Sequence, residues 1–261
     1  MISLIVSHYK NMPALQLVFK TLARQTSQDF EVIVAEDDNS QECADFIATC
    51  KQTYSFDIQH IFHEKIGFRK CKILNDAVRV SRGEKLVFID GDCILHKRFI
   101  AEYNKAIAPN NYYYGRRVWL NETITQTLLK TQDLNLLNLA NLIRFGVSNP
   151  FAGLYVPLPY KAAHKRREIW GCNWGVLKEY VLGINGFDED FTQTGYGEDL
   201  HIGWRLRKHY NLQLISLKKR AIQYHLHHAR SIIPQSGKEL YEQKITSGET
   251  ICKHGLQKIN I

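Results

Sequence analysis

The chain has 261 residues, of which 44% are hydrophobic and 23% charged, a composition typical of globular proteins that excludes a largely disordered chain. Its formal net charge of +8 favours anionic partners, such as phosphate-bearing ligands, nucleic acid or an anionic membrane surface. The basic residues are spread out, apart from Lys161 to Arg167 and Lys218 to Arg220, and no helix-turn-helix or aromatic RNA-binding motif accompanies them, so we expect no nucleic-acid partner.

The first half of the chain alternates short apolar runs with helical patterns. The apolar runs predict strands at 2–7, 30–35, 56–62 and 85–89, and the segments between them predict helices at 13–24, 41–52 and 69–82. This alternation is typical of an α/β fold with a mostly parallel sheet flanked by helices, whose ligands bind beyond the carboxyl ends of the strands. Three polar segments come at such strand ends: Ser7-His8-Tyr9, Glu36 to Ser40, and Asp90-Gly91-Asp92.

The second half of the chain is less regular. In chain order, the residues predict a strand at 112–120, a helix at 123–145, a loop at 146–168, a turn rich in Gly and Trp, a helix near 198–209 and a strand near 212–218. No internal repeat or low-complexity linker divides the chain, so we expect one domain with a C-terminal half appended to the sheet.

The six cysteines include no C-x-x-C pair, so we expect no structural zinc site. The apolar start, Met1 to Ser7, is too short for a signal sequence, and no apolar run reaches the length that spans a bilayer. We therefore expect reduced thiols and a cytoplasmic protein, in contact with a membrane at most peripherally.

The Asp90-Gly91-Asp92 motif places two carboxylates at the end of a buried strand. The two charges would repel each other there, and a hard divalent cation such as Mg²⁺ or Mn²⁺ would resolve that repulsion while binding phosphate oxygens. Asp-Gly is also a common turn dipeptide. The motif by itself therefore leaves a metal site and a solvated turn as equal alternatives.

A second acidic group, Glu36-Asp37-Asp38, comes at the end of the second strand. It can cap the following helix, or accept a hydrogen bond from a nucleobase N–H or a ribose hydroxyl, and both roles are compatible. No G-x-G-x-x-G motif follows the first strand, which argues against a dinucleotide-dependent oxidoreductase.

Basic residues open the third predicted helix, against the helix dipole. We expect Arg69 to face a nucleotide, with Asn75 one turn further along the helix. A solvated basic face is the favoured interpretation for Lys70 and Lys72. The basic stretch from Lys161 to Arg167 is where we expect acceptor or membrane contact.

The segment from Trp170 to Arg207 is dense in Gly, aromatic and acidic residues. Glu198 and Asp199 begin a predicted helix there, where the helix dipole stabilises carboxylates. The pair is either an acidic cap or a catalytic base beside a sugar-binding floor.

Three histidines lie within four residues late in the chain, at positions 225, 227 and 228. On a strand, His225 and His227 would point to opposite faces, so we expect at most one of them to reach a given metal ion.

Taken together and in this order, these motifs resemble the family-2 glycosyltransferases with the GT-A fold. The resemblance covers about residues 2–95. In addition, residues from about 171 to 207 are similar to the C-terminal part of galactosyltransferases and chondroitin-polymerase-type enzymes. Residues 121–168 match no part of the family pattern. The resemblance implies a single domain over 1–261, with a nucleotide-binding half at 1–95, a metal and acceptor half at 96–230 and a C-terminal helical tail at 231–261.

The resemblance implies a role for each motif residue. The uracil and ribose of a UDP-sugar would contact Ser7, Tyr9, Asp37, Asp38, Arg69, Asn75 and Asp90. Asp92 falls on the family's metal ligand and His225 on its late histidine ligand, for Mn²⁺ or Mg²⁺. Asp199 falls on the catalytic base and Glu198 on a sugar contact. The extra acid Glu36 leaves open which carboxylate of its group meets the nucleobase.

The resemblance implies an inverting, metal-dependent transfer of a hexose or N-acetylhexosamine from a UDP-sugar to a glycan or lipid-linked acceptor, and we expect it to serve surface polysaccharide synthesis. One alternative is a non-catalytic carbohydrate- or nucleotide-binding domain, which would require a broken catalytic set. Another is a sugar nucleotidyltransferase, which would require a Gly-rich loop after the first strand. The residues at 7–11 contain no glycine.

Overall fold

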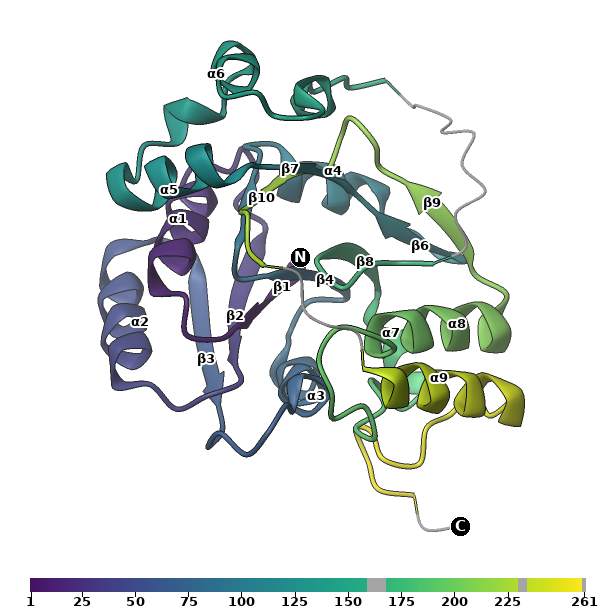
Figure 1. The fold of residues 1–261 in the computed structure, drawn as a ribbon. Helices are drawn as coiled ribbons and strands as arrows, with labels where there is room; N and C mark the ends of the chain where they lie inside the picture. Colours follow the sequence, from purple (N-terminus) through teal and green to yellow (C-terminus); the bar gives the residue numbers. More distant parts are fainter. Residues whose placement is uncertain (159–167, 230–233, 260–261) are drawn as a thin grey trace.

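The computed structural model describes residues 1–158, 168–229 and 234–259 (Figure 1). Its main sheet has seven strands in the order β3-β2-β1-β4-β8-β6-β9. Their bounds are β1 (Ile2–His8), β2 (Phe30–Glu36), β3 (Asp57–Phe62), β4 (Lys85–Asp90), β6 (Asn111–Tyr114), β8 (Asn173–Leu177) and β9 (Gln213–Ser216). The first four are mutually parallel, β8 runs antiparallel to both of its neighbours, and β6 and β9 pair in parallel. The sheet is therefore mostly parallel, as the sequence predicts.

Helices cover both faces of this sheet (Figure 1). On one face, a core cluster joins the sheet to α1 (Met12–Leu22), α2 (Gln41–Thr53) and α4 (Phe99–Ala106). On the other face, a second cluster joins it to α3 (Lys70–Val80), α7 (Lys178–Gly183), α8 (Glu198–Tyr210) and α9 (Gln235–Ser247). Within β1, Leu4 and Val6 belong to the first cluster and Ile5 to the second. Burial on both faces explains why these strands read as continuous apolar runs.

A smaller sheet lies beside the main one and carries the late histidines. Its order is β5-β10-β7, formed by β5 (Cys93–Leu95), β10 (Ile222–His225) and β7 (Arg116–Trp119). A third apolar cluster packs this sheet against α1 and the helical segment above it, which consists of α5 (Glu122–Thr131), η1 (Leu134–Leu137), α6 (Leu139–Arg144) and η2 (Pro150–Gly153).

The structure corrects three predictions in the second half. The strand expected at 112–120 is two strands in different sheets, β6 and β7, which separate at Gly115. A side chain at Gly115 would lie 2.3 Å from the backbone oxygen of Ala221, so only glycine allows this close passage between the sheets. The helix expected at 123–145 is broken into α5, η1 and α6. The expected Gly- and Trp-rich turn contains β8, an inner strand of the main sheet.

The six cysteines are all buried free thiols, in agreement with the expectation of reduced cysteines. No helix within the described ranges has both the length and the apolarity needed to cross a membrane. The basic stretch from Lys161 to Arg167, where we expected acceptor or membrane contact, lies outside the described residues.

Candidate active site

The polar segments that follow β1, β2 and β4 meet at one edge of the main sheet. Ser7 pairs with Ala35 of β2 on one side and with Asp90 of β4 on the other, so the ends of the three strands are level. They border a cleft of about 760 Å³, which is large enough for a nucleotide-sized ligand. Among the predicted site residues, those that line it are Ser7, Tyr9, Asp37, Asp90, Asp92 and Glu198. These predicted residues, from separate parts of the sequence, thus lie along one cleft.

One end of the cleft carries Tyr9, Asp37 and Lys65. The Lys65 ammonium lies 2.8 Å from Asp37 Oδ2 and 4.2 Å from the centre of the half-exposed Tyr9 ring. His63 Nε2 lies 2.7 Å from Asp37 Oδ1, and the Arg69 backbone N–H donates to Oδ2. Burial opposes ionisation of Asp37, but these hydrogen bonds outweigh it and lower its pKa. An aromatic face next to an ionised carboxylate suits a flat, hydrogen-bonding base.

The three acids that follow β2 point in different directions. Asp37 borders the cleft, whereas Glu36 is fully buried beneath it and Asp38 lies near Lys10, with 3.8 Å between Asp38 Oδ2 and Lys10 Nζ. Asp37 is the carboxylate of this group that a ligand in the cleft can reach.

Two predicted nucleotide contacts occupy other positions. The Asn75 side chain is fully buried between α3 and the turn before α8, where its amide donates to the Phe187 backbone oxygen and to Glu189, and its oxygen accepts from Phe187 N–H. Asn75 therefore holds two segments together and does not border the cleft. The Arg69 guanidinium donates to the backbone oxygen of Glu64, and Arg69 is likewise absent from the cleft lining.

Lys70, expected on a solvated face, instead lies at the floor of the cleft. Its ammonium is 2.8 Å from Asp90 Oδ1. Burial lowers the pKa of Lys70, but the carboxylates of Asp90 and Glu198 more than offset this and raise it. For Asp90 the signs are reversed: burial raises its pKa, and the Lys70 ammonium more than offsets burial and lowers it. Asp90 is therefore ionised. Lys72, in contrast, pairs with Asp76 near the surface of α3, with 3.2 Å between their charged atoms.

Asp92 lies between two histidines. Its carboxylate oxygens are 3.7 Å from His225 Nε2 and 3.6 Å from His228 Nε2. The Nδ1 atoms of the two rings face the backbone oxygens of Leu226 and Ala229 at 2.8 Å. If Nδ1 carries the proton, each Nε2 presents a lone pair, the arrangement in which histidine binds metal ions. The candidate ligand atoms lie within 4.8 Å of one another.

Of His225 and His227, His225 is the one that lies beside Asp92 among the described residues, and the sequence did not foresee that His228 joins it there. β10 ends at His225, so the alternation of a strand does not continue to the next residues. The chain turns, and His228 joins His225 beside Asp92, whereas the exposed His227 is tied by its backbone N–H to Thr125 Oγ1.

Glu198 and Asp199 begin α8 at the far wall of the cleft. Asp199 accepts hydrogen bonds from the backbone N–H groups of Gly171 at 2.6 Å and Leu200 at 2.8 Å. Glu198 borders the cleft, and its Oε2 is buried without a hydrogen-bond partner in the described structure. Burial and the adjacent Asp199 raise the pKa of Glu198 to about 7, and burial also raises the pKa of Asp199.

The two carboxylates differ in their access to the ligand cleft. Asp199 does not line the large cleft itself. It borders a small adjoining cavity that shares Ser7, Lys70 and Glu198 with the cleft. The Asp199 carboxylate is thus fixed in orientation, while Glu198 is the more accessible group.

Sequence reasoning missed an aromatic and cationic wall behind the histidines. The Arg117 guanidinium lies 3.9 Å from the centre of the Trp119 ring and 4.0 Å from that of Trp170. These residues border a cavity of about 110 Å³, and the Trp119 ring is 4.6 Å from the His225 ring. Trp119 and Trp170 are 51 positions apart in the printed sequence, so no local motif could have revealed the wall.

Known proteins are similar to this chain in sequence or in architecture. A validoxylamine A glucosyltransferase from Streptomyces hygroscopicus subsp. jinggangensis is 23% identical over 234 residues, covering 80% of this chain and 52% of the relative. The chain thus spans about half the length of this curated relative.

Two solved structures support the fold. S. aureus TarS in complex with UDP-GlcNAc superposes with a TM-score of 0.63 at 14% identity, over 94% of this chain and 64% of that one. The mannosyltransferase PcManGT from Pyrobaculum calidifontis, in complex with GDP-Man and Mn²⁺, superposes with a TM-score of 0.59 at 13% identity, over 94% and 60%. At this low identity the likeness shows the fold, and it confirms the expected GT-A architecture.

The family model described as glycosyl transferase family 2 matches residues 3–162. The match starts in β1 and extends past the Asp90-Gly91-Asp92 motif, and it covers more than half of the chain. The protein therefore belongs to glycosyl transferase family 2.

Proposed function

We propose that the protein is a metal-dependent, inverting glycosyltransferase that moves a hexose or N-acetylhexosamine from a UDP-sugar to a hydroxyl group of a glycan or lipid-linked acceptor. One observation carries this proposal: a cleft at the carboxyl edge of the sheet brings Asp37, Lys70 with Asp90, the Asp92 histidine cluster and Glu198 to a common space. The motif acids on which the prediction depends are all present.

The nucleotide would lie across the ends of β1 and β2. Tyr9 offers a ring face and Asp37 an acceptor for a base N–H, while Ser7 and Asp90 lie deeper, in the direction of the ribose. Lys65 and Lys70 place two positive charges along the same cleft, where they favour a diphosphate. The complex of the structural neighbour TarS with UDP-GlcNAc supports a uridine nucleotide sugar as donor.

The Asp92, His225 and His228 group fits a divalent cation. It supplies one carboxylate and two imidazole nitrogens, a donor set that Mn²⁺ accepts, and the cleft leaves room for phosphate oxygens. When bound there, Mn²⁺ or Mg²⁺ would supply the positive charge that stabilises a departing diphosphate. The neighbour PcManGT with GDP-Man and Mn²⁺ supports this assignment.

Asp199 is the proposed base. Its two backbone hydrogen bonds fix its orientation, and its raised pKa makes it a better proton acceptor than an ordinary aspartate. It would accept the proton of the acceptor hydroxyl as that oxygen attacks the anomeric carbon. The bond from this carbon to the diphosphate breaks on the opposite side, so the configuration inverts. Glu198, at the cleft wall, would contact the sugars and share the proton with Asp199.

The acceptor would bind beside the aromatic wall formed by Arg117, Trp119 and Trp170. Indole faces stack on the apolar faces of sugar rings, and the wall touches His225 at the proposed metal site. The name of the Streptomyces relative, a glucosyltransferase, supports a hexosyl transfer. We place this reaction in the cytoplasm, in surface polysaccharide synthesis, with peripheral contact to a membrane that carries a lipid-linked acceptor.

A donor panel tests the proposal. The protein would be incubated with UDP-glucose, UDP-galactose, UDP-GlcNAc, UDP-GalNAc or GDP-mannose, together with a mixture of sugar and lipid-linked acceptors. Nucleoside diphosphate release would be followed with Mn²⁺, Mg²⁺ or EDTA. We expect release with one or two of the UDP-sugars, loss of release with EDTA, and a product of inverted anomeric configuration by NMR.

The same panel, together with a further incubation with a sugar phosphate and UTP, separates the alternatives. Tight UDP-sugar binding without turnover of any donor would indicate a non-catalytic binding domain. Formation of a nucleotide sugar from a sugar phosphate and UTP would indicate a nucleotidyltransferase. A retained anomeric configuration in the product would contradict the single-displacement mechanism.

A further inference from the structure

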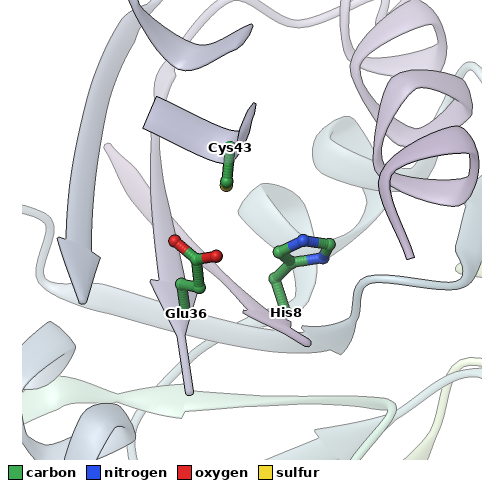
Figure 2. A group of neighbouring side chains, drawn as sticks. All are labelled: His8, Glu36 and Cys43. Atoms are coloured by element: carbon green, nitrogen blue, oxygen red, sulfur yellow. The ribbon is translucent and has the colours of Figure 1, made fainter. Parts of the chain in front are cut away.

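A second group of side chains that could hold a metal ion lies at the ends of β1 and β2, and one of them, His8, also borders the cleft. Figure 2 shows His8, Glu36 and Cys43 pointing toward one another. They come from three elements: His8 ends β1, Glu36 ends β2, and Cys43 lies in the first turn of α2. All three side chains are buried, and their ligand atoms lie within 4.8 Å of one another. The group is thus a compact, enclosed set of one nitrogen, one oxygen and one sulfur donor.

Hydrogen bonds inside the protein leave part of this group unsatisfied. His60, from β3, contacts Glu36 through its Nε2, which lies 2.8 Å from Oε2. The other carboxylate oxygen, Glu36 Oε1, is buried without a partner in the described structure, and so is His8 Nε2. A buried polar atom without a partner costs about 1–3 kcal/mol, so two of them in one small space need an explanation.

We propose that His8, Glu36 and Cys43 bind a Zn²⁺ ion, through His8 Nε2, Glu36 Oε1 and Cys43 Sγ. This site is separate from the Asp92 cluster and does not depend on the identity of donor or acceptor. The two unpartnered atoms are the ones that the ion would take. His60 keeps its contact with Oε2 and orients the carboxylate, as residues behind metal ligands commonly do.

The chemistry of the three donors selects zinc over the hard cations. Thiolate and imidazole are preferred ligands of Zn²⁺, whereas Mg²⁺ and Ca²⁺ require oxygen donors. Burial lowers the pKa of His8 to about 4, so its imidazole is neutral and able to coordinate. Burial and Glu36 raise the pKa of the Cys43 thiol, so zinc binding must release the thiol proton to solvent. Three protein ligands leave the fourth tetrahedral position to a water molecule.

The proposed zinc site lies next to the donor cleft. His8 itself borders the cleft between Ser7 and Tyr9, and Glu36 precedes the cleft residue Asp37. A bound ion would tie the ends of β1 and β2 to α2 and hold these cleft residues in place. The sequence predicted no structural zinc site because it contains no C-x-x-C pair, but here the ligands come from separate elements and only folding brings them together.

Cobalt and zinc binding to the full chain, prepared without a histidine tag, tests the site. All of these measurements would use protein that carries the substitution Asp92→Asn, which weakens the other candidate metal site, and that has been freed of metal before the titration. We expect about one Zn²⁺ per chain by elemental analysis after dialysis. Co²⁺ should give the near-ultraviolet charge-transfer band of a cobalt–thiolate bond and the intense visible bands of tetrahedral coordination.

Two cysteines of α2 provide a matched pair of variants in this background. Cys43→Ser should abolish the thiolate band and weaken zinc binding at least about tenfold. Cys50→Ser, on the same helix and also buried but outside the cluster, should leave both unchanged. Zinc should raise the melting temperature of the Cys50→Ser protein and not that of the Cys43→Ser protein.

The cobalt spectrum is recorded on the Asp92→Asn protein, which retains Cys43. It therefore tests for the cobalt–thiolate bond even if the Cys43→Ser protein fails to fold. A cobalt complex without a thiolate band, or zinc binding that is equal in the Cys43→Ser and Cys50→Ser proteins, would overturn the proposal.

Discussion

The Lys70 ammonium lies 2.8 Å from Asp90 Oδ1, at the floor of the cleft between α3 and the end of β4. Burial lowers the pKa of this ammonium, but the charges of Asp90, Glu198 and Asp199 more than offset burial and raise it, so one cation balances three carboxylates. This relationship joins the nucleotide side of the cleft to the proposed base. It also explains how several acids can occupy one partly buried site.

Replacing Lys70 by Met should destabilise the protein and weaken donor binding. The substitution leaves Asp90 without its cation in a site of low polarity, and breaking a buried pair costs about 3 kcal/mol. Urea denaturation would measure the free energy of unfolding, and UDP titration the binding. Lys72→Met is the control, because the Lys72–Asp76 pair lies near the surface, and we expect a change within about 0.5 kcal/mol. Equal effects of the two substitutions would contradict the role assigned to Lys70.

The rate of transfer should fall as the pH decreases through about 7. The pKa of Glu198 is raised to about 7, and a proton taken up by the Glu198–Asp199 pair removes the base from its active, ionised form. The acid limb of kcat/KM against pH would report this pKa in the free enzyme. Glu198→Gln removes the carboxyl group whose pKa burial and Asp199 raise to about 7, so the acid limb of this variant should move to lower pH. A limb that stays at the same pH would exclude this coupling.

Removal of His228 should weaken metal binding, whereas removal of His227 should not. His228 Nε2 lies 3.6 Å from Asp92 Oδ2, while His227 is exposed and donates its backbone N–H to Thr125 Oγ1. We expect His228→Ala to lower the affinity for Mn²⁺ at least about tenfold, measured by isothermal titration. His227→Ala is the matched control, and a similar loss in that variant would show that the ligand assignment is wrong.

The sequence predicted β1 to β4 because their apolar runs are bounded by polar residues at both ends, and because burial on both faces makes such runs continuous. It missed β8, whose residues 173–177 read as a turn since their strand character depends on pairing with Lys85 to Ile89 of β4, far away in the chain. The break at Gly115 is likewise a tertiary effect, imposed by the approach of Ala221 and Asn173.

The site shows the same division between local and long-range information. Motif residues at strand ends, such as Ser7, Asp37 and Asp90, were correctly placed at one edge because parallel strands share that edge. The sequence did not predict the direction in which a side chain points within a helix or beyond the end of a strand, because that direction depends on tertiary packing. Lys70 and Asn75 were therefore assigned to the opposite environments from those they occupy.

Asn75→Ala should reduce stability and leave donor binding unchanged. The side chain makes three hydrogen bonds to the segment at 187–189, and the substitution leaves the Phe187 backbone groups unpaired. We expect a loss of about 2–3 kcal/mol in the free energy of unfolding by urea denaturation. An unchanged stability together with a raised KM for the donor would instead place Asn75 in the donor site, as the sequence first indicated.

The most direct test of the proposed function is the Asp199→Asn protein, measured for sugar transfer and for UDP-sugar binding in the same buffer with Mn²⁺. Asparagine keeps the size of the side chain but cannot accept the acceptor proton. We expect the rate of transfer to fall by about 10²- to 10⁴-fold, with the dissociation constant for the UDP-sugar changed little. Full transfer activity in this variant would contradict the assignment of Asp199 as the base.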